Sequence, residues 1–242
     1  AIDGVGADTQ DYIDLLVGCG AQLPMAAKLR LLTSDPNAAR QAPSGVECRQ
    51  IEPLDYFAYS KFCVEGLADH VDTTHCLMVQ LDGFVLNKQR WTPEFAEYDY
   101  IGAPWLSTQR RPLPTGCTVG SGGFSLRSAR FLAQSAQLEW HRDWQDYDVP
   151  EKYWGNEDYF LAVICRQQLE AAGLRFAPES LARRFSIQAG DRLGPDHWLP
   201  NVFGFHGRGL MRRVHRYLKA QDLDYPHLER NLPRRRYFIL PW

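Results

Sequence analysis

Long apolar runs are missing from this 242-residue sequence: no stretch approaches the roughly 20 consecutive apolar residues of a membrane-spanning helix. Internal repeats and low-complexity segments are missing too, which argues against a repeat architecture and against disorder. Charged residues make up 23% of the chain and hydrophobic residues 45%, as in an ordinary globular protein. The length therefore predicts a single domain that buries a sizeable core.

The cysteines lack the spacing of a metal or redox motif. None of the six belongs to a Cys-x-x-Cys pair, and no cysteine–histidine cluster has the spacing of a zinc site. Several lie inside apolar segments, such as Cys63 and Cys165. We interpret them as buried thiols of a reducing compartment rather than as disulfides, and therefore predict a cytoplasmic protein.

Charge is unevenly distributed along the chain, although the net charge is only −2. From Gly207 to Trp242 nine lysines and arginines stand against three acids, while the rest of the chain is acidic. This basic tail suits an anionic partner such as the inner membrane surface, a pyrophosphate or a charged glycan, and a solvated helix face accounts for it equally well. Nucleic acid is not expected, because the body is acidic and no recognition motif is present.

Predicted helices and strands alternate along the chain. Residues 2–4 read as the end of a first strand, as if the domain began a few residues upstream. The pattern predicts an α/β domain of residues 1–207 with a mostly parallel, Rossmann-like central sheet flanked by helices. The basic residues 208–242 would pack on this domain or extend from it. The expected strands are residues 28–33, 46–51, 75–81 and 98–103, and the expected helices are residues 8–18, 55–70, 128–138, 157–172 and 210–219.

Ligands bind beyond the carboxyl ends of strands in such sheets, and two conspicuous segments follow predicted strands. Asp82 comes directly after the apolar run at residues 75–81, where its carboxylate can hold a divalent cation that bridges a diphosphate. Gly83 would let the backbone approach that ligand, although Asp-Gly is also a common turn pair. Trp105 follows the strand at residues 98–103 and offers an aromatic face for a sugar ring.

The glycine-rich segment Gly120–Gly123 precedes Arg127. Three glycines in four residues allow tight turns and leave amides free for sugar hydroxyls or phosphate, and a plain structural bend is the alternative. The segment is neither a Walker loop nor a dinucleotide fingerprint, because the lysine and the glycine spacing of those motifs are absent. Nucleoside triphosphate hydrolysis and dinucleotide chemistry therefore receive no support.

A second acidic segment opens the helix predicted at residues 157–172, preceded by Trp154 and Asn156. Either Glu157 or Asp158 could act as general base for an acceptor hydroxyl, or both could simply stabilise the helix dipole. Late in the chain, His206 lies between glycines and aromatic residues. Its imidazole suits a metal or a phosphate oxygen, or serves only as a hydrogen-bonded structural group.

These candidates belong to six segments: HCLMVQLDGFVLN, YDYIGAPW, VGSGGFSLRS, GNEDYF, FAPESLARRFSIQ and FGFHG. In order and spacing the segments resemble a bacterial and fungal family, the domain of unknown function 5672, which is regarded as glycosyltransferase-like. The resemblance extends from about residue 75 to residue 207. It implies a GT-A type fold and a sugar transfer.

The segment from Trp154 to Asp158 is also similar, more distantly, to the acidic block of GT-A enzymes such as the β-1,4-galactosyltransferases. That similarity implies Asp158, or else Glu157, as the catalytic base of an inverting transfer. It also implies a Mn²⁺ or Mg²⁺ ion held by Asp82 and His206. One departure makes metal dependence uncertain: the usual Asp-x-Asp motif is Gln80-Leu81-Asp82 here, so the first carboxylate is an amide.

The resemblance implies a nucleotide diphosphate sugar as donor, a UDP-sugar being favoured, and a glycan or lipid-linked hydroxyl as acceptor in polysaccharide biosynthesis. Without a metal, arginines such as Arg127, Arg183 and Arg184 would offset the leaving diphosphate. The segment at residues 106–116 is expected to act as a lid. A carboxylate-pair glycoside hydrolase and an inactive glycan-binding module stay open as alternatives. The expected donor and acceptor contacts are Gln80, Asp82, Gly83, Trp105, Gly122, Gly123, Arg127, Trp154 and Asn156.

Overall fold

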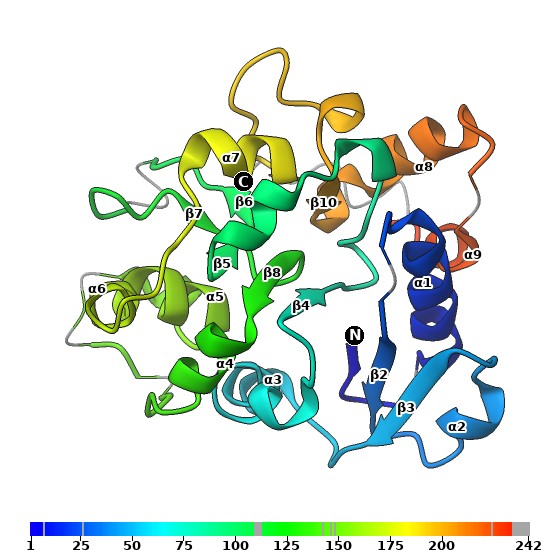
Figure 1. Ribbon diagram of the computed structural model, residues 1–242, viewed down its shortest axis with the longest axis horizontal. Helices are drawn as coiled ribbons and strands as arrows, with labels where there is room; N and C mark the ends of the chain where they lie inside the picture. The colour runs from blue at the N-terminus through cyan, green and yellow to red at the C-terminus, as the bar shows by residue number, and fades with distance from the viewer. Residues whose placement is uncertain are drawn as a thin grey trace.

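The N-terminal part of the chain forms a parallel sheet covered by a helix (Figure 1). The computed structural model describes residues 1–233 except residues 7, 26, 109–112, 142, 146, 148 and 224. Strand order is β1-β2-β3, and Ile2 lies opposite Leu32 in the register. The elements are β1 (Ile2–Asp3), α1 (Thr9–Gln22), β2 (Leu29–Thr33), α2 (Ala38–Gln41) and β3 (Val46–Gln50).

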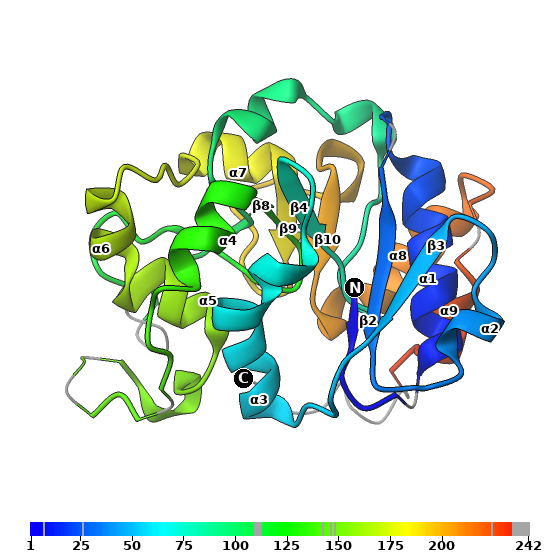
Figure 2. The ribbon, with the colours of Figure 1, turned by 60° about the horizontal axis from the view of Figure 1, so that its bottom comes forward.

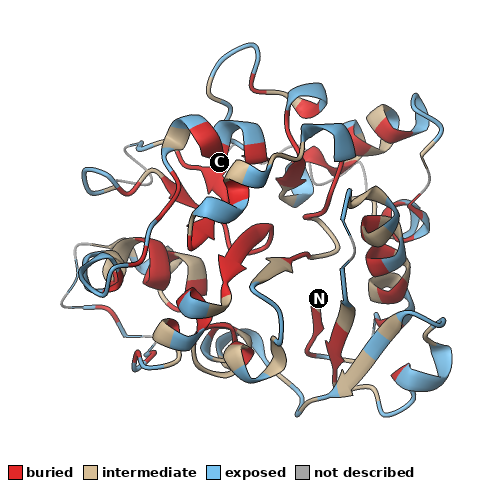
Figure 3. Ribbon diagram, in the orientation of Figure 1, coloured by how far each residue is buried: buried red, intermediate tan, exposed pale blue. Residues whose placement is uncertain are grey.

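The middle of the chain builds an antiparallel sheet in the order β4-β8-β5. Figure 3 shows β8 buried along its whole length at the centre of this sheet. The other strands among the described residues form two pairs: β6 pairs with β7 in antiparallel orientation, and β9 pairs with β10 in parallel orientation. The strands are β4 (His75–Met78), β5 (Tyr100–Ile101), β6 (Ala103–Pro104), β7 (Val119–Gly120), β8 (Ser125–Ser128), β9 (Ser186–Gln188) and β10 (Gly204–His206).

Helices surround these strands, as the two views in Figures 1 and 2 show. The C-terminal helices α8 and α9 lie beside α1 and share its core: Val214, Leu218 and Leu228 belong to the same buried cluster as Ile13 and Leu16. The remaining helices are α3 (Tyr56–Lys61), α4 (Ala129–Ser135), α5 (Glu157–Tyr159), α6 (Arg166–Ala171), α7 (Glu179–Phe185), α8 (Met211–Lys219) and α9 (Pro226–Arg230).

The mixed α/β class predicted from the sequence is confirmed, but the single, mostly parallel central sheet is not what the strands form. Among the described residues there are four small sheets, two parallel and two antiparallel. The difference arises at β8, which is not among the strands expected from the sequence. Its polar residues are buried because partners distant in sequence satisfy them, and β8 separates β4 from β5.

The helix predicted at residues 157–172 is interrupted. A π-helical segment at Phe160–Ile164 separates α5 from α6, and another at Phe62–Gly66 follows α3. Within the described residues no helix is both long and apolar enough to cross a membrane. All six cysteines carry free thiols, four of them buried.

Candidate functional site

The first part of the site is a tight turn that places Asp82 beside His206. Gln80 and Gly83 exchange two backbone hydrogen bonds of 2.8 and 2.9 Å, which leaves Asp82 near the tip of the turn. The chain then runs antiparallel to β10, and the Gly207 amide donates to the Asp82 carbonyl at 2.8 Å. As a result, His206 Nε2 lies 3.9 Å from Asp82 Oδ1, and both side chains keep about a fifth of their surface exposed (20% and 24%).

Polar partners on both ring nitrogens fix the orientation of the His206 imidazole. Nδ1 lies 3.2 Å from the Ser121 hydroxyl, and Nε2 lies 3.3 Å from Gln80 Oε1. The Gln80 amide nitrogen donates to the Tyr59 hydroxyl at 2.7 Å, so its oxygen is the atom that faces the histidine. Burial raises the pKa of Tyr59 well above its usual value, which keeps this phenol neutral.

The second part of the site is the acidic start of α5. Asp158 accepts two backbone hydrogen bonds, one from the Gly122 amide at 3.1 Å and one from the Tyr159 amide at 2.8 Å. Glu157 reaches the same glycine from another side: a β-carbon on Gly122 would lie 1.8 Å from Glu157 Oε1. Only glycine leaves room for the Glu157 carboxylate at this position.

The two parts of the site meet at consecutive glycines. A β-carbon on Gly123 would lie 2.2 Å from His206 Nε2 and 2.3 Å from Gln80 Oε1, whereas Gly122 contacts the acids of α5. The positive φ of this segment belongs to Ser121, at 71°, and not to the glycines. The glycines therefore provide space for close approach more than the tight turning that the sequence suggested. Contacts between residues 36, 85 and 126 positions apart in the sequence converge here.

A buried ion pair lies beneath the acids. Arg127 is fully buried on β8, and its Nη2 lies 3.4 Å from Glu157 Oε1, while its Nε donates to the Ser125 hydroxyl at 3.1 Å. Glu157 itself is 9% exposed. Burial, and then the neighbouring charge of Asp158, raise the pKa of the Glu157 carboxyl to about 7, against the opposing effect of Arg127.

The predicted aromatic contacts occupy different environments. Trp105 is 3% exposed, stacks on Tyr159 with ring centroids 5.5 Å apart, and donates from Nε1 to Gln188 Oε1 at 2.8 Å. This packing leaves little of the indole face for a sugar. Trp154 is half-buried and donates to the Val149 carbonyl at 3.0 Å. Asn156 accepts a hydrogen bond from the Tyr56 hydroxyl, an exposed residue of α3.

The other arginines considered from the sequence lie on α7. Arg183 donates to the Leu193 carbonyl at 2.6 Å, and Arg184 forms an ion pair of 2.9 Å with Glu94. These contacts do not include the residues that converge on Gly122 and Gly123. Of the three arginines considered from the sequence, Arg127 is the one that contacts that site, through Glu157. The lid predicted at residues 106–116 includes residues 109–112, which lie outside the described residues; next to them, the Leu106 amide donates to Asp191 at 3.1 Å.

Sequence reasoning missed two members of the site, Tyr59 and Ser121. Tyr59 has core-like spacing in its helix, and nothing in that pattern shows that its hydroxyl contacts Gln80. Ser121 was visible only as part of the glycine segment. Its positive φ and its contact with His206 depend on β10, which is far away in the sequence.

The side chains at His206 are of the types that bind a hard divalent cation, but they are few. Asp82 offers a carboxylate, His206 an imidazole nitrogen and Gln80 an amide oxygen, all ligand types that Mn²⁺ or Mg²⁺ accepts. No group of three or more histidine, cysteine or acidic side chains suited to a metal occurs within the described residues. A cation here would therefore need oxygen ligands from a substrate, such as the oxygens of a diphosphate.

The structure is that of a mixed α/β protein in which the acids of α5 and His206 converge on Gly122 and Gly123, shortly before β8 in the chain. The family model described as protein of unknown function (DUF5672) matches residues 55–206, and the chain belongs to this family. The matched segment starts at the residue that caps α3 and ends at His206, so it contains every residue that converges at the glycine pair. Comparison with the curated proteins finds no match.

Proposed function

We propose that this protein is a glycosyltransferase of the GT-A type that transfers a sugar from a nucleotide diphosphate sugar to an acceptor hydroxyl, with inversion. The supporting observation is the convergence of two chemically different groups on Gly122 and Gly123. The acids of α5 contact the first glycine, while His206 and Gln80 lie against the second, with Asp82 Oδ1 3.9 Å from His206 Nε2. Such a transfer needs a base and a centre that stabilises the leaving diphosphate, held close together.

Glu157 is the residue best suited to act as the general base. A base works best when its pKa lies near the working pH, and burial raises the pKa of Glu157 to about 7. Asp158 is engaged with the Gly122 amide, so its role is to position the glycine segment. Arg127 lies beneath Glu157 and prevents its pKa from rising further.

Asp82, His206 and Gln80 would hold the diphosphate end of the donor. A Mn²⁺ or Mg²⁺ ion bound there would neutralise charge on the leaving diphosphate, with the contacts of Ser121 and Gln80 orienting the imidazole. The GT-A type of fold agrees with the parallel β1-β2-β3 unit and with a carboxylate that follows β4. The choice of a UDP-sugar and of a glycan or lipid-linked acceptor rests on the family resemblance.

Contact with an anionic membrane would come from α8. Its apolar residues Met211, Val214 and Leu218 are buried, while basic side chains such as Arg213 and Arg216 are exposed. Because the apolar face is used inside the fold, such a contact would be electrostatic and salt-sensitive. The last basic residues, Arg234–Arg236, lie outside the described residues.

Nucleotide binding is the sharpest test of the proposal. We expect UDP or GDP with Mn²⁺ to raise the melting temperature by about 5 °C at saturating ligand, since ligand at 100 times its Kd adds about 2.7 kcal/mol. Asp82→Asn should abolish the Mn²⁺-dependent part of this shift, whereas the exposed Asp69→Asn should preserve it. If neither nucleotide stabilises the protein, the glycosyltransferase proposal fails, and a hydrolase or glycan-binding role replaces it.

A further inference from the structure

Two exposed aromatic side chains lie at the start of α3, which runs beside α5 in both views of Figures 1 and 2. Tyr56 is 58% exposed and Phe57 is 36% exposed. Their ring centroids are 5.5 Å apart and the ring planes meet at 76°, so the two rings form a corner. We call this pair the aromatic platform. Exposed apolar side chains that gather in one place, instead of being scattered singly, mark binding surfaces.

The segment that directly precedes Glu157 holds the aromatic platform in place. The Tyr56 hydroxyl donates to Asn156 Oδ1. The Phe57 ring lies against Gly155, where a β-carbon would come within 2.6 Å of Phe57 Cε1, and the φ of Gly155 is +82°, in the left-handed region. Glycine is required at this position for both reasons. The platform is therefore anchored one and two residues before the proposed general base.

Helix α3 connects the two parts of the site. Tyr56 and Tyr59 are three residues apart, so they lie on the same face of the helix, about 4.5 Å apart along its axis. Tyr59 accepts a hydrogen bond from Gln80 at 2.7 Å, on the side where the diphosphate would be held. Tyr56 reaches Asn156, on the side of the acids. The aromatic platform thus lies at the end of the site that an acceptor would approach, away from the leaving diphosphate.

The charges around the aromatic platform are negative. Burial, and then the charges of Glu157 and Asp158, raise the pKa of the Tyr56 hydroxyl to about 12, so both carboxylates act on this ring. Asp55, the exposed residue that caps α3, precedes Tyr56 directly. Three carboxyl groups so close by repel phosphate and uronic acid groups. The platform is therefore suited to an uncharged ligand.

We propose that the aromatic platform binds an uncharged pyranose ring of the acceptor and directs one of its hydroxyls toward Glu157. This inference rests on the proposed function, which makes Glu157 the base. The C–H face of a pyranose ring is flat and weakly positive, so it packs on the negative face of one aromatic ring and against the edge of the other. A ring held in this corner is positioned for proton removal. The acceptor is thereby narrowed from any hydroxyl to a glycan that ends in a neutral sugar.

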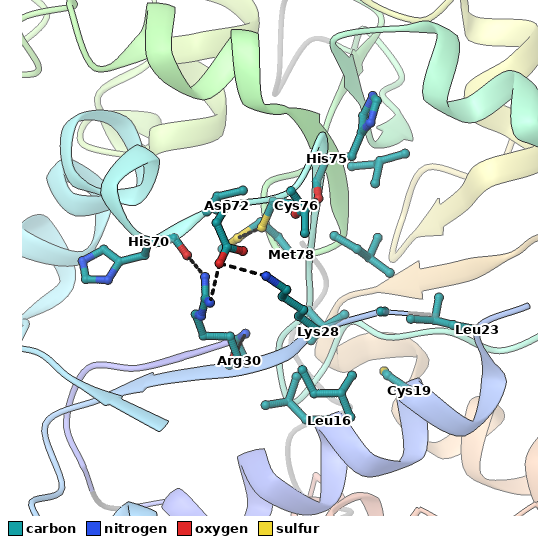
Figure 4. Close-up of a pocket in the computed structure, with 18 of the residues that line it drawn as sticks. Leu16, Cys19, Leu23, Lys28, Arg30, His70, Asp72, His75, Cys76 and Met78 are labelled. Atoms are coloured by element: carbon teal, nitrogen blue, oxygen red, sulfur yellow. Dashed lines mark hydrogen bonds and ion pairs between the residues drawn. The ribbon is translucent and has the colours of Figure 1, made fainter. Parts of the chain in front are cut away.

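The cavity of about 810 Å³ between the two three-stranded sheets is a poorer place for this sugar. Figure 4 shows the apolar side chains of Leu16 and Cys19 on one side of it. Its charged side chains are engaged with one another, because Asp72 forms ion pairs with Lys28 at 3.0 Å and with Arg30 at 3.3 Å. Sugar hydroxyls buried there would lack partners. The acids of α5 are not among the described residues that line this cavity.

The test titrates lactose and cellobiose, two neutral disaccharides, into the full chain without nucleotide and follows saturation transfer from the protein to the sugar protons. We expect the double variant Tyr56→Ala with Phe57→Ala to bind both sugars about tenfold more weakly, because two aromatic contacts are lost. Phe57→Tyr keeps the ring and should keep the affinity. The matched control is Tyr147→Ala, which removes a ring that is 43% exposed but contacts His141 instead. Equal affinities of the double variant and the wild type, or no saturation transfer in the wild type, would overturn the proposal.

Sugar binding and nucleotide binding are measured separately, so the two proposals can fail separately. Saturation transfer that depends on Tyr56 and Phe57, in a protein that neither UDP nor GDP stabilises, would support the aromatic platform and contradict the glycosyltransferase. Stabilisation by nucleotide without any saturation transfer to the sugars would contradict the platform alone. Methyl glucuronide, an anionic sugar of similar size, should bind more weakly than the neutral sugars, because the carboxylates beside the platform repel it. Equal or tighter binding of the glucuronide would contradict the preference for an uncharged ring.

Discussion

Replacing Glu157 by glutamine is expected to lower the rate of sugar transfer by about 10²–10⁴-fold while nucleotide binding persists. Glutamine keeps the shape of the side chain and a hydrogen bond to Arg127, but it cannot accept the proton of an acceptor hydroxyl. The measurement is release of nucleotide from a donor panel in the presence of acceptors, with binding followed by thermal shift. A variant that transfers at the wild-type rate would remove Glu157 from the mechanism.

The pH dependence separates a base from a structural acid. In the wild type the rate should rise with pH up to about 7, the pKa of Glu157, and this ascending limb should disappear in Glu157→Gln. Asp158→Asn is the matched control, because it alters the neighbouring acid that accepts the Gly122 amide. Asp158→Asn should keep the rise of the rate with pH. It should bind the donor more weakly, because the Gly120–Gly123 segment is held less firmly when the acceptor of the Gly122 amide changes. An ascending limb that persists in Glu157→Gln and disappears in Asp158→Asn would exchange the two roles.

The free energy of unfolding should also depend on pH through the carboxyl group of Glu157. The pKa of Glu157 is raised in the folded protein from 4.5 to about 7, so the folded state holds this proton more tightly than the unfolded chain. Its contribution to stability is complete below about pH 4.5 and is lost as pH rises through about 7. Urea unfolding at several pH values should show this decline, of up to roughly 3 kcal/mol, and Glu157→Gln should flatten it. A decline of equal size in the glutamine variant would assign it to another group.

What the sequence predicts well is local. The short strand expected at residues 28–33 and the alternating pattern of residues 46–51 predict β2 and β3 to within one residue at each end, because residue type along a strand is a local property. The aspartate after the apolar run and the acids that open α5 were also visible, since position relative to an element is a local property.

What the sequence could not predict depends on partners distant along the chain. β8 contains a buried arginine and serines, and such a segment reads as a loop until Glu157 is known to face Arg127 from 30 residues away. Tyr59 reads as a core residue of its helix, although its hydroxyl bonds to Gln80. The glycines at 122 and 123 were conspicuous, yet what they make room for is defined only by the fold.

Arg127 should affect both the stability of the fold and the pKa of Glu157. We expect its removal to be the most damaging single change at the site. Arg127→Met is expected to lower the free energy of unfolding by about 3–5 kcal/mol, because Glu157 would be left buried without its cation. The same change should raise the pKa of Glu157, since Arg127 is the charge that lowers it. Urea unfolding measures the first effect, and the pH–rate profile, displaced toward alkaline pH, measures the second.

The double variant Arg127→Met with Glu157→Gln provides the control, because it removes both charges. It should be more stable than Arg127→Met alone by at least about 1 kcal/mol, since a neutral amide tolerates the apolar neighbour better than a carboxylate does. Arg127→Lys keeps the charge but loses the planar group that donates to both the Ser125 hydroxyl and the Cys63 carbonyl, so it should restore the pH profile better than the stability. If the two methionine variants unfold alike, the ion pair is not what holds β8 against α5, and the packing of Arg127 over the Tyr100 ring carries that role instead.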